Sequence, residues 1–152
     1  MLILPDGRGM FDTVHPVFLI QVVLCNPFSL ENYVTPRPLI VCIEDNEQHL
    51  RLRKAVLEKS GYDVIGVTTA HDALTVLRQC PVCLVLSDHM LRGTTGAELA
   101  SKLKKIKMDV PIVVHSGTTP ETMKHVDGFV SKDLSTTEFL AFIRDFVRRY
   151  CS

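Results

Sequence analysis

The sequence has no excess of charge of either sign, no long apolar run and no cysteine framework. Because 17 basic side chains balance 17 acidic ones, there is no general reason to expect nucleic acid or an anionic membrane as a partner. No apolar stretch approaches the ~20 residues of a membrane-spanning helix. No basic start followed by a small-residue cleavage site marks a secretory signal. At 152 residues, we therefore expect one cytoplasmic globular domain.

The five cysteines are odd in number and lack the spacing of a disulfide framework. Cys80 and Cys83 form the motif CPVC, but a redox pair of this spacing usually begins a helix, and a zinc site needs a second pair of ligands. Here the motif leads into an apolar stretch and no second pair follows. We interpret the cysteines as structural.

The composition changes near residue 38. Residues 1–38 hold five of the eight prolines and only five charged residues, and no helical or strand period persists in them. We interpret them as an N-terminal extension that is poorly ordered or precedes the true start. No methionine lies between Met10 and Met90, so a start codon at a valine such as Val34 is one explanation. Residues 39–152 would then form the folded domain.

From residue 39, five apolar stretches alternate with stretches of helical pattern. The expected strands are LIVCIED (39–45), DVIGVTT (63–69), CLVLSD (83–88), PIVVHS (111–116) and GFVSK (128–132). The expected helices are NEQHLRLRKAVLEKSGY, ending near Gly61, then AHDALTVLRQC, GAELASKLKKIK, a short and weak TPETMKHV, and STTEFLAFIRDFVRRY with Ser135 or Thr136 as its cap.

This alternation predicts an α/β fold in which a parallel sheet is covered on both faces by helices. Right-handed crossovers restrict it to doubly wound orders, and these bind ligands beyond the carboxyl ends of the strands. The informative residues are therefore those that end the strands: Glu44 and Asp45, Asp88, Ser116 and Lys132.

Three carboxylates within about 4 Å of one another repel by several kcal/mol per pair. They must therefore take up protons or share a cation. Mg²⁺ is commonly bound by oxygen ligands alone, one or two of which come from carboxylates. A carboxylate beside Mg²⁺ can act as a nucleophile that forms an aspartyl phosphate. Lys132 and Ser116 could then contact the phosphoryl oxygens.

The motifs IEDN, SDHMLRGTTG, VVHSG and GFVSK follow one another at predicted strand ends. Together they resemble the response-regulator receiver domain of two-component signalling, the CheY-like family, over residues 39 to about 150. The resemblance implies a three-layer, doubly wound, five-stranded parallel sheet of flavodoxin-like order 2-1-3-4-5. It also implies these site residues: Asp88 as phosphoacceptor, Ser116 as switch hydroxyl, Lys132 as the lysine that contacts phosphate, Phe129 as switch aromatic, and Glu44, Asp45, Asp88 and the backbone carbonyl of Met90 around Mg²⁺, with Gly96 at the expected glycine.

As a function, the resemblance implies a receiver that accepts a phosphoryl group from a histidine kinase or a histidine phosphotransfer protein. Such a domain promotes its own phosphorylation and dephosphorylation and is not a conventional enzyme. Because the sequence ends after the last predicted helix, we expect a single-domain type. It would signal by docking to an unknown downstream protein or by relaying the phosphate, with no nucleic-acid or membrane partner.

Three features depart from the family pattern. Arg92 and Asp133 stand where prolines are usual, and Asp133 removes the normal reason for a cis peptide bond after Lys132. Only 13 positions separate Ser116 from Phe129, which predicts a shortened fourth helix. The shortened helix and Asp133 motivate an alternative function, a receiver-like module that binds partners independently of phosphate.

Other interpretations are weaker. An aspartyl-phosphate hydrolase of similar topology would carry a second aspartate two residues after the nucleophile, where this sequence has Met90. His89 could be a metal ligand or phosphodonor, but alternation along a strand points it away from Asp88. The run KLKKIK is better explained as a solvated helix face than as a nucleic-acid patch.

Overall fold

The computed structural model describes residues 36–151, so most of the extension predicted for residues 1–38 lies outside the described part. Five parallel strands form one sheet in the order β2-β1-β3-β6-β7. This order confirms the predicted flavodoxin-like topology. The strands are β1 (Leu39–Ile43), β2 (Asp63–Val67), β3 (Leu84–Asp88), β6 (Ile112–Ser116) and β7 (Gly128–Ser131).

Within residues 36–151, the structure has four helices: α2 (Glu47–Lys59), α3 (Ala70–Gln79), α4 (Gly96–Ile106) and α5 (Thr136–Tyr150). Each follows a polar N-cap whose side chain accepts a hydrogen bond from the first turn. Ser135 caps α5, as one of the two predicted alternatives. None of the helices in the described part of the chain is long and apolar enough to span a membrane.

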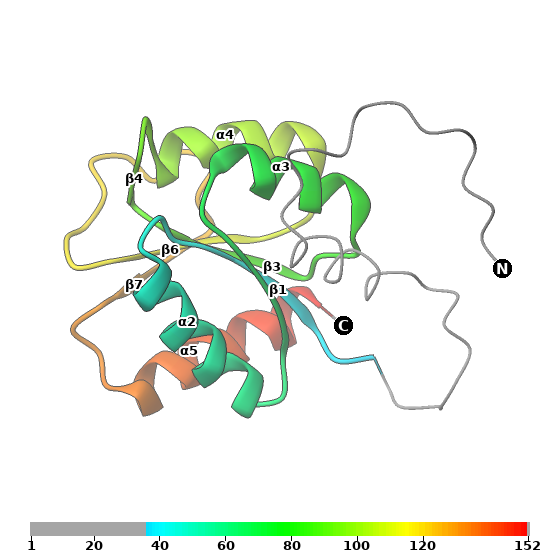
Figure 1. The fold of residues 1–152 in the computed structure, drawn as a ribbon, viewed down its shortest axis with the longest axis vertical. Coiled ribbons are helices and arrows are strands. Elements are labelled where there is room, and N and C mark those ends of the chain that lie inside the picture. The colour runs from blue at the N-terminus through cyan, green and yellow to red at the C-terminus, as the bar shows by residue number, and fades with distance from the viewer. Residues whose placement is uncertain (1–35, 152) are drawn as a thin grey trace, which may run out of the picture.

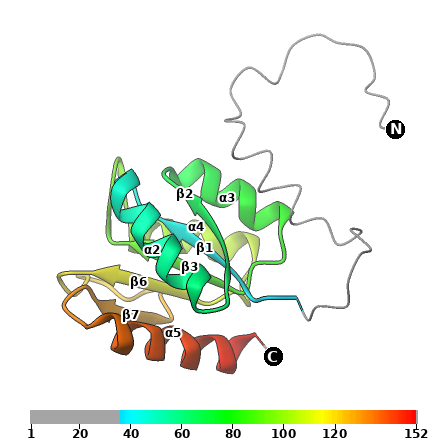
Figure 2. The ribbon, with the colours of Figure 1, turned by 60° about the horizontal axis from the view of Figure 1, so that its bottom comes forward.

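The helices cover both faces of the sheet, α2 and α5 on one side and α3 and α4 on the other (Figure 1). Successive strand residues point to opposite faces, so each strand contributes to two cores. In β1, Val41 and Ile43 pack with α3 and α4, whereas Ile40 and Cys42 pack with α2 and α5. Figure 2 shows α5 lying along the edge of the sheet formed by β6 and β7. The predicted three layers are confirmed.

The shortened fourth helix is confirmed in an extreme form, because residues 117–127 join β6 to β7 without any helix. The segment contains Pro120, and His125 has a φ of 66°, which a right-handed helix does not allow. Val126 packs against the core beside α3 and α4, but the segment offers no continuous apolar face that could stabilise a helix.

The loop after β3 contains a two-stranded antiparallel ribbon that was not predicted, β4 (Met90–Leu91) paired with β5 (Thr94–Thr95). Gly93 has a φ of 77°, a conformation that glycine adopts without strain, and it makes the turn of the ribbon. Arg92 lies in this turn. The ribbon returns the chain to the start of α4 directly beside Asp88.

A disulfide joins Cys83, just before β3, to Cys151 at the end of α5, across 68 positions of sequence. Cys42 and Cys80 are buried and lie outside any disulfide. The pairing was missed in the sequence because so long a separation carries no spacing signal. It ties the last turn of α5 to the sheet.

Candidate functional site

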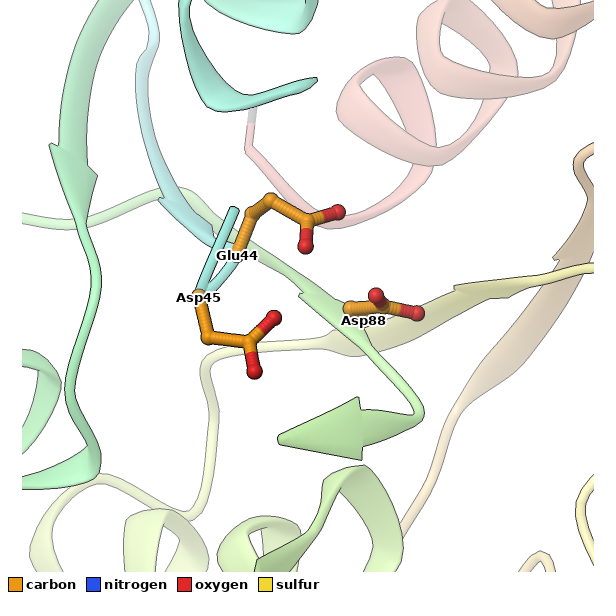
Figure 3. A group of neighbouring side chains, drawn as sticks. All are labelled: Glu44, Asp45 and Asp88. Carbon is orange, nitrogen blue, oxygen red and sulfur yellow. The ribbon is translucent and has the colours of Figure 1, made fainter. Parts of the chain in front are cut away.

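The carboxyl ends of β1 and β3 bring three predicted carboxylates together. Ile43 pairs in register with Ser87, so Glu44 stands beside Asp88 at the end of the neighbouring strand. One oxygen from each of Glu44, Asp45 and Asp88 can be chosen so that all three lie within 4.8 Å of one another. Figure 3 shows the three carboxylates arranged around a common space. In residues 36–151 no other group of acids, histidines or cysteines meets this criterion, and His89 does not belong to it.

Asp88 is only 7% exposed. A buried carboxylate at the end of an apolar strand is costly unless it is paired. Its Oδ2 accepts a hydrogen bond from Lys132 Nζ at 3.1 Å. Its Oδ1 accepts one from the His89 N–H at 2.8 Å. Lys132 Nζ also lies 3.7 Å from Glu44 Oε2, so one ammonium joins two of the three acids. The predicted meeting of Asp88 and Lys132 is present.

Glu44 is the most deeply buried of the three acids, at 1% exposed. Its Oε1 accepts a hydrogen bond from the Asn46 N–H at 3.2 Å, and its Oε2 accepts one from Arg53 Nη2 at 3.1 Å. Burial raises the pKa of Glu44 and the charge of Asp88 adds to that rise, whereas the Asn46 hydrogen bond and the positive charges of Arg53 and Lys132 oppose it. Both oxygens of this carboxylate are thus occupied by donors of the protein.

Arg53 was missed in the sequence, although a signal was present. The buried residues of α2 are Leu50, Arg53 and Leu57, at the spacing of one helical face. A charge on such a face needs a buried partner. Here the partner is Glu44.

Asp45 is the most accessible carboxylate of the group. Its Oδ2 lies 3.8 Å from Nε of Arg92, whose side chain extends into solvent from the β4–β5 turn. An open depression of about 620 Å³ adjoins both residues. This depression gives solvent access to Asp45.

Ser116 ends β6, the strand next to that of Asp88, and Phe129 lies one strand further out, in β7. His115 is the register partner of Asp88, so Ser116 comes one residue later, and it is buried. The Lys132 N–H donates to the Ser116 carbonyl at 2.9 Å, which ties the ends of β6 and β7 together. Phe129 pairs in register with Val114 and is partly buried. No cis peptide bond occurs in residues 36–151, in line with the expectation for Asp133.

His115 is a second residue that sequence reasoning did not single out. Its ring stacks on Phe139 of α5 with centroids 4.9 Å apart, beside a cavity of about 320 Å³. Burial lowers the pKa of His115 to about 3, helped by the positive charges of Arg53 and Lys132. The ring is therefore neutral at physiological pH.

The donor set fits a small hard cation. Carboxylate oxygens are the ligands that Mg²⁺ prefers, and the close approach of three acids favours a shared cation. Asp45 and Asp88 are the carboxylates best placed to bind it, because Glu44 is held by the buried guanidinium of Arg53, whereas the ammonium that holds Asp88, that of Lys132, is one-third exposed. A phosphoryl group on Asp88 would also have an ammonium within reach, that of Lys132.

Comparisons with known proteins agree with this geometry. Residues 40–144 match the sequence profile of the family described as "Response regulator receiver domain". The phosphate regulon transcriptional regulatory protein PhoB of Pseudomonas aeruginosa is 31% identical over 118 residues, which make up 72% of this chain and 52% of PhoB. The chain thus matches about half the length of this curated relative.

Two solved structures illustrate the fold. A CheY-like response regulator receiver domain protein from Methanospirillum hungatei is 22% identical, with a TM-score of 0.70 over 75% of this chain and 96% of that one. The response regulator TrrA of Thermotoga maritima, solved in complex with Mg²⁺-BeF, is 21% identical, with a TM-score of 0.67 over 72% of this chain and 98% of that one. With the strand order and the matched family profile, these results lead to one conclusion. The chain belongs to the response regulator receiver domain family of two-component systems.

Proposed function

We propose that this receiver domain accepts a phosphoryl group on Asp88. The observation that carries the proposal is the 3.1 Å contact between Lys132 Nζ and Asp88 Oδ2 inside a group of three carboxylates. The donor would be the phosphohistidine of a histidine kinase or of a histidine phosphotransfer protein. The domain would promote this transfer and the later hydrolysis without being a conventional enzyme.

In the transfer, a carboxylate oxygen of Asp88 attacks phosphorus, a P–O bond forms and the P–N bond to the donor histidine breaks. Lys132 would move from the free carboxylate to a phosphoryl oxygen, because the charge of Asp88 is then shared with the phosphoryl group. Ser116 would donate its hydroxyl hydrogen to another phosphoryl oxygen. Phe129, in the strand that precedes Lys132, would change its packing with the phosphorylation state.

A divalent cation is part of the proposal. We assign Asp45, Asp88 and the backbone carbonyl of Met90 to Mg²⁺, with Glu44 contributing charge from beside them. Mg²⁺ would neutralise charge on the phosphoryl oxygens during transfer. The donor set of the three carboxylates supports this assignment, and so does the Mg²⁺-BeF complex of the related TrrA.

Output would occur through proteins. We propose that residues 39–152 form the receiver unit, with residues 1–38 as an extension, and that it works in the cytoplasm. The phosphorylated form would dock on a downstream protein or pass its phosphoryl group onward. No nucleic acid or membrane is needed for either route.

The test is phosphorylation with acetyl phosphate and Mg²⁺, followed by intact-mass spectrometry. We expect a single added phosphate in the wild type, none without Mg²⁺ and none in Asp88→Asn. Asp72→Asn, which removes a partly buried carboxylate in the first turn of α3, away from the three-carboxylate group, is the matched control and should be labelled like the wild type. Labelling that persists in Asp88→Asn would overturn the assignment.

A second candidate function is a phosphate-independent interaction module. The absence of any helix in residues 117–127 favours it, because a shortened segment leaves less structure to move on phosphorylation. Partner binding that is equally tight with and without BeF₃⁻ and Mg²⁺ would support this candidate. A change in affinity supports the phosphorylated switch.

A further inference from the structure

Arg53 is a buried cation whose position is explained by one acidic partner. Its side chain is 6% exposed, and it projects from the buried face of α2 toward the end of β1. Its Nη2 donates to Glu44 Oε2 at 3.1 Å. This is the one ion pair that Arg53 makes within residues 36–151.

The other contacts of the guanidinium are incomplete. Arg53 Nη1 is buried and has no hydrogen-bond partner. The thiol of Cys42 also faces Arg53, and burial raises the pKa of that thiol to about 11, so it remains neutral. An arginine with an unsatisfied donor is costly to bury, and an apolar side chain at this position of α2 would pack without that cost. The contribution of Arg53 therefore lies at the carboxylates, through Glu44.

The consequence of the pair is visible on Glu44. Arg53 holds one carboxylate oxygen and the Asn46 N–H holds the other. A carboxylate fixed in this way contributes charge to the site without a free oxygen for direct coordination. Asp88 also accepts two hydrogen bonds, but the Lys132 side chain that makes one of them is 33% exposed, whereas Arg53 is buried. Asp45 and Asp88 therefore remain the two carboxylates that can face a cation.

We propose that Arg53 is a positioning residue that keeps Glu44 out of direct coordination and so gives the site its preference for Mg²⁺ over Ca²⁺. The inference rests on the metal site of the proposed function. Mg²⁺ needs few protein ligands because it retains several waters, whereas Ca²⁺ takes six to eight oxygens and benefits from each added carboxylate. An oxygen of Glu44 lies within 4.8 Å of the oxygens of Asp45 and Asp88, so a released Glu44 could become a third ligand.

The experiment measures the affinities of Mg²⁺ and Ca²⁺ by isothermal titration calorimetry in the wild type and four variants. The wild type should prefer Mg²⁺. In Arg53→Met, the affinity ratio should shift toward Ca²⁺ by about tenfold. Arg53→Lys should restore most of the wild-type ratio, and the double variant Glu44→Gln/Arg53→Met should remove the gain in Ca²⁺ affinity because no third carboxylate remains.

Arg51→Met is the matched control. Arg51 lies on the same helix, but its side chain is 82% exposed and, among the described residues, forms an ion pair only with Glu47, so its removal takes away an equal charge without releasing Glu44. Its ratio of Mg²⁺ to Ca²⁺ affinity should equal that of the wild type. Circular dichroism melts establish that each variant is folded.

A measurement on the wild type alone does not depend on the folding of any variant. With ¹³C-labelled carboxyl groups, saturating Mg²⁺ should shift the NMR resonances of Asp45 and Asp88 more than that of Glu44. An equal shift of Glu44 would overturn the proposal, as would an unchanged affinity ratio in a folded Arg53→Met. If Asp88 is phosphorylated in the presence of Mg²⁺ but the ratio of Mg²⁺ to Ca²⁺ affinity is unchanged in Arg53→Met, this inference fails and the proposed function stands. Absence of both Mg²⁺ binding and labelling overturns both.

Discussion

Lys132 Nζ lies 3.1 Å from Asp88 Oδ2, across 44 positions of sequence. The same ammonium is 3.7 Å from Glu44 Oε2. In this arrangement Lys132 balances the negative charge that a divalent cation would otherwise neutralise. Lysine and cation therefore compete electrostatically, although both are expected to favour phosphoryl transfer.

The first prediction follows from this competition. Lys132→Met should tighten Mg²⁺ binding by about threefold, because one positive charge leaves the site. The same variant should slow acetyl-phosphate labelling of Asp88 by at least about tenfold, because no ammonium remains for the phosphoryl oxygens. Calorimetry and intact-mass spectrometry measure the two effects. Parallel losses of metal binding and labelling would indicate that Lys132 only supports the fold.

The second prediction concerns stability and pH. The pKa of His115 is lowered to about 3 from 6.5, so between these values the unfolded chain binds a proton that the folded chain does not. The contribution of His115 to the free energy of unfolding is therefore fully present above pH 6.5 and declines as the pH falls toward 3. The free energy of unfolding changes by at most about 1.4 kcal/mol per pH unit from this residue, and partial exposure of the His115 ring reduces that slope.

In His115→Phe, which can still stack on Phe139, the free energy of unfolding should fall less between pH 7 and pH 5 than in the wild type. Urea unfolding at each pH measures the difference. His71→Phe, at an exposed position of α3, should keep the wild-type profile. Identical pH profiles for wild type and His115→Phe would contradict the prediction.

The third prediction concerns the disulfide. Cys83 and Cys151 close a loop of 68 positions, and the chain-entropy relation gives about 4 kcal/mol for such a loop. Reduction should therefore lower the urea midpoint of the wild type. Cys151→Ser should resemble the reduced protein and show no further response to the reductant. Alkylation of both cysteines before any reduction would argue against the bond.

The fourth prediction concerns the glycine that begins α4. A Cβ on Gly96 would lie 2.7 Å from the backbone oxygen of Asp88 and 3.3 Å from His89 Cα. Gly96→Ala should cost about 1–3 kcal/mol of stability and displace the Asp88 loop, which weakens Mg²⁺ binding. Gly117→Ala is the matched control, because a Cβ there meets nothing within 4 Å. Equal melting temperatures for the two variants would count against close packing at Gly96.

Much of the site could be predicted because it depends on order along the chain. Apolar runs of strand length alternating with amphipathic helices specify a parallel sheet, and such a sheet places all strand ends on one edge. Asp88, Lys132 and the Glu44–Asp45 pair were recognisable because each follows an apolar run. The switch roles of Ser116 and Phe129, the carbonyl of Met90 and the bound Mg²⁺ stay predictions.

The amino-acid sequence by itself determined the fold class and the carboxylates that share the site, because these follow from periodicity and from residues next in sequence to a strand. The strand order was implied by the family resemblance. Only the tertiary structure decided that Arg53 pairs with Glu44, that His115 stacks on Phe139 and that Cys83 meets Cys151. It also decided that residues 117–127 form no helix. Such contacts depend on which side chains meet when separate elements pack, and a local pattern does not contain that information.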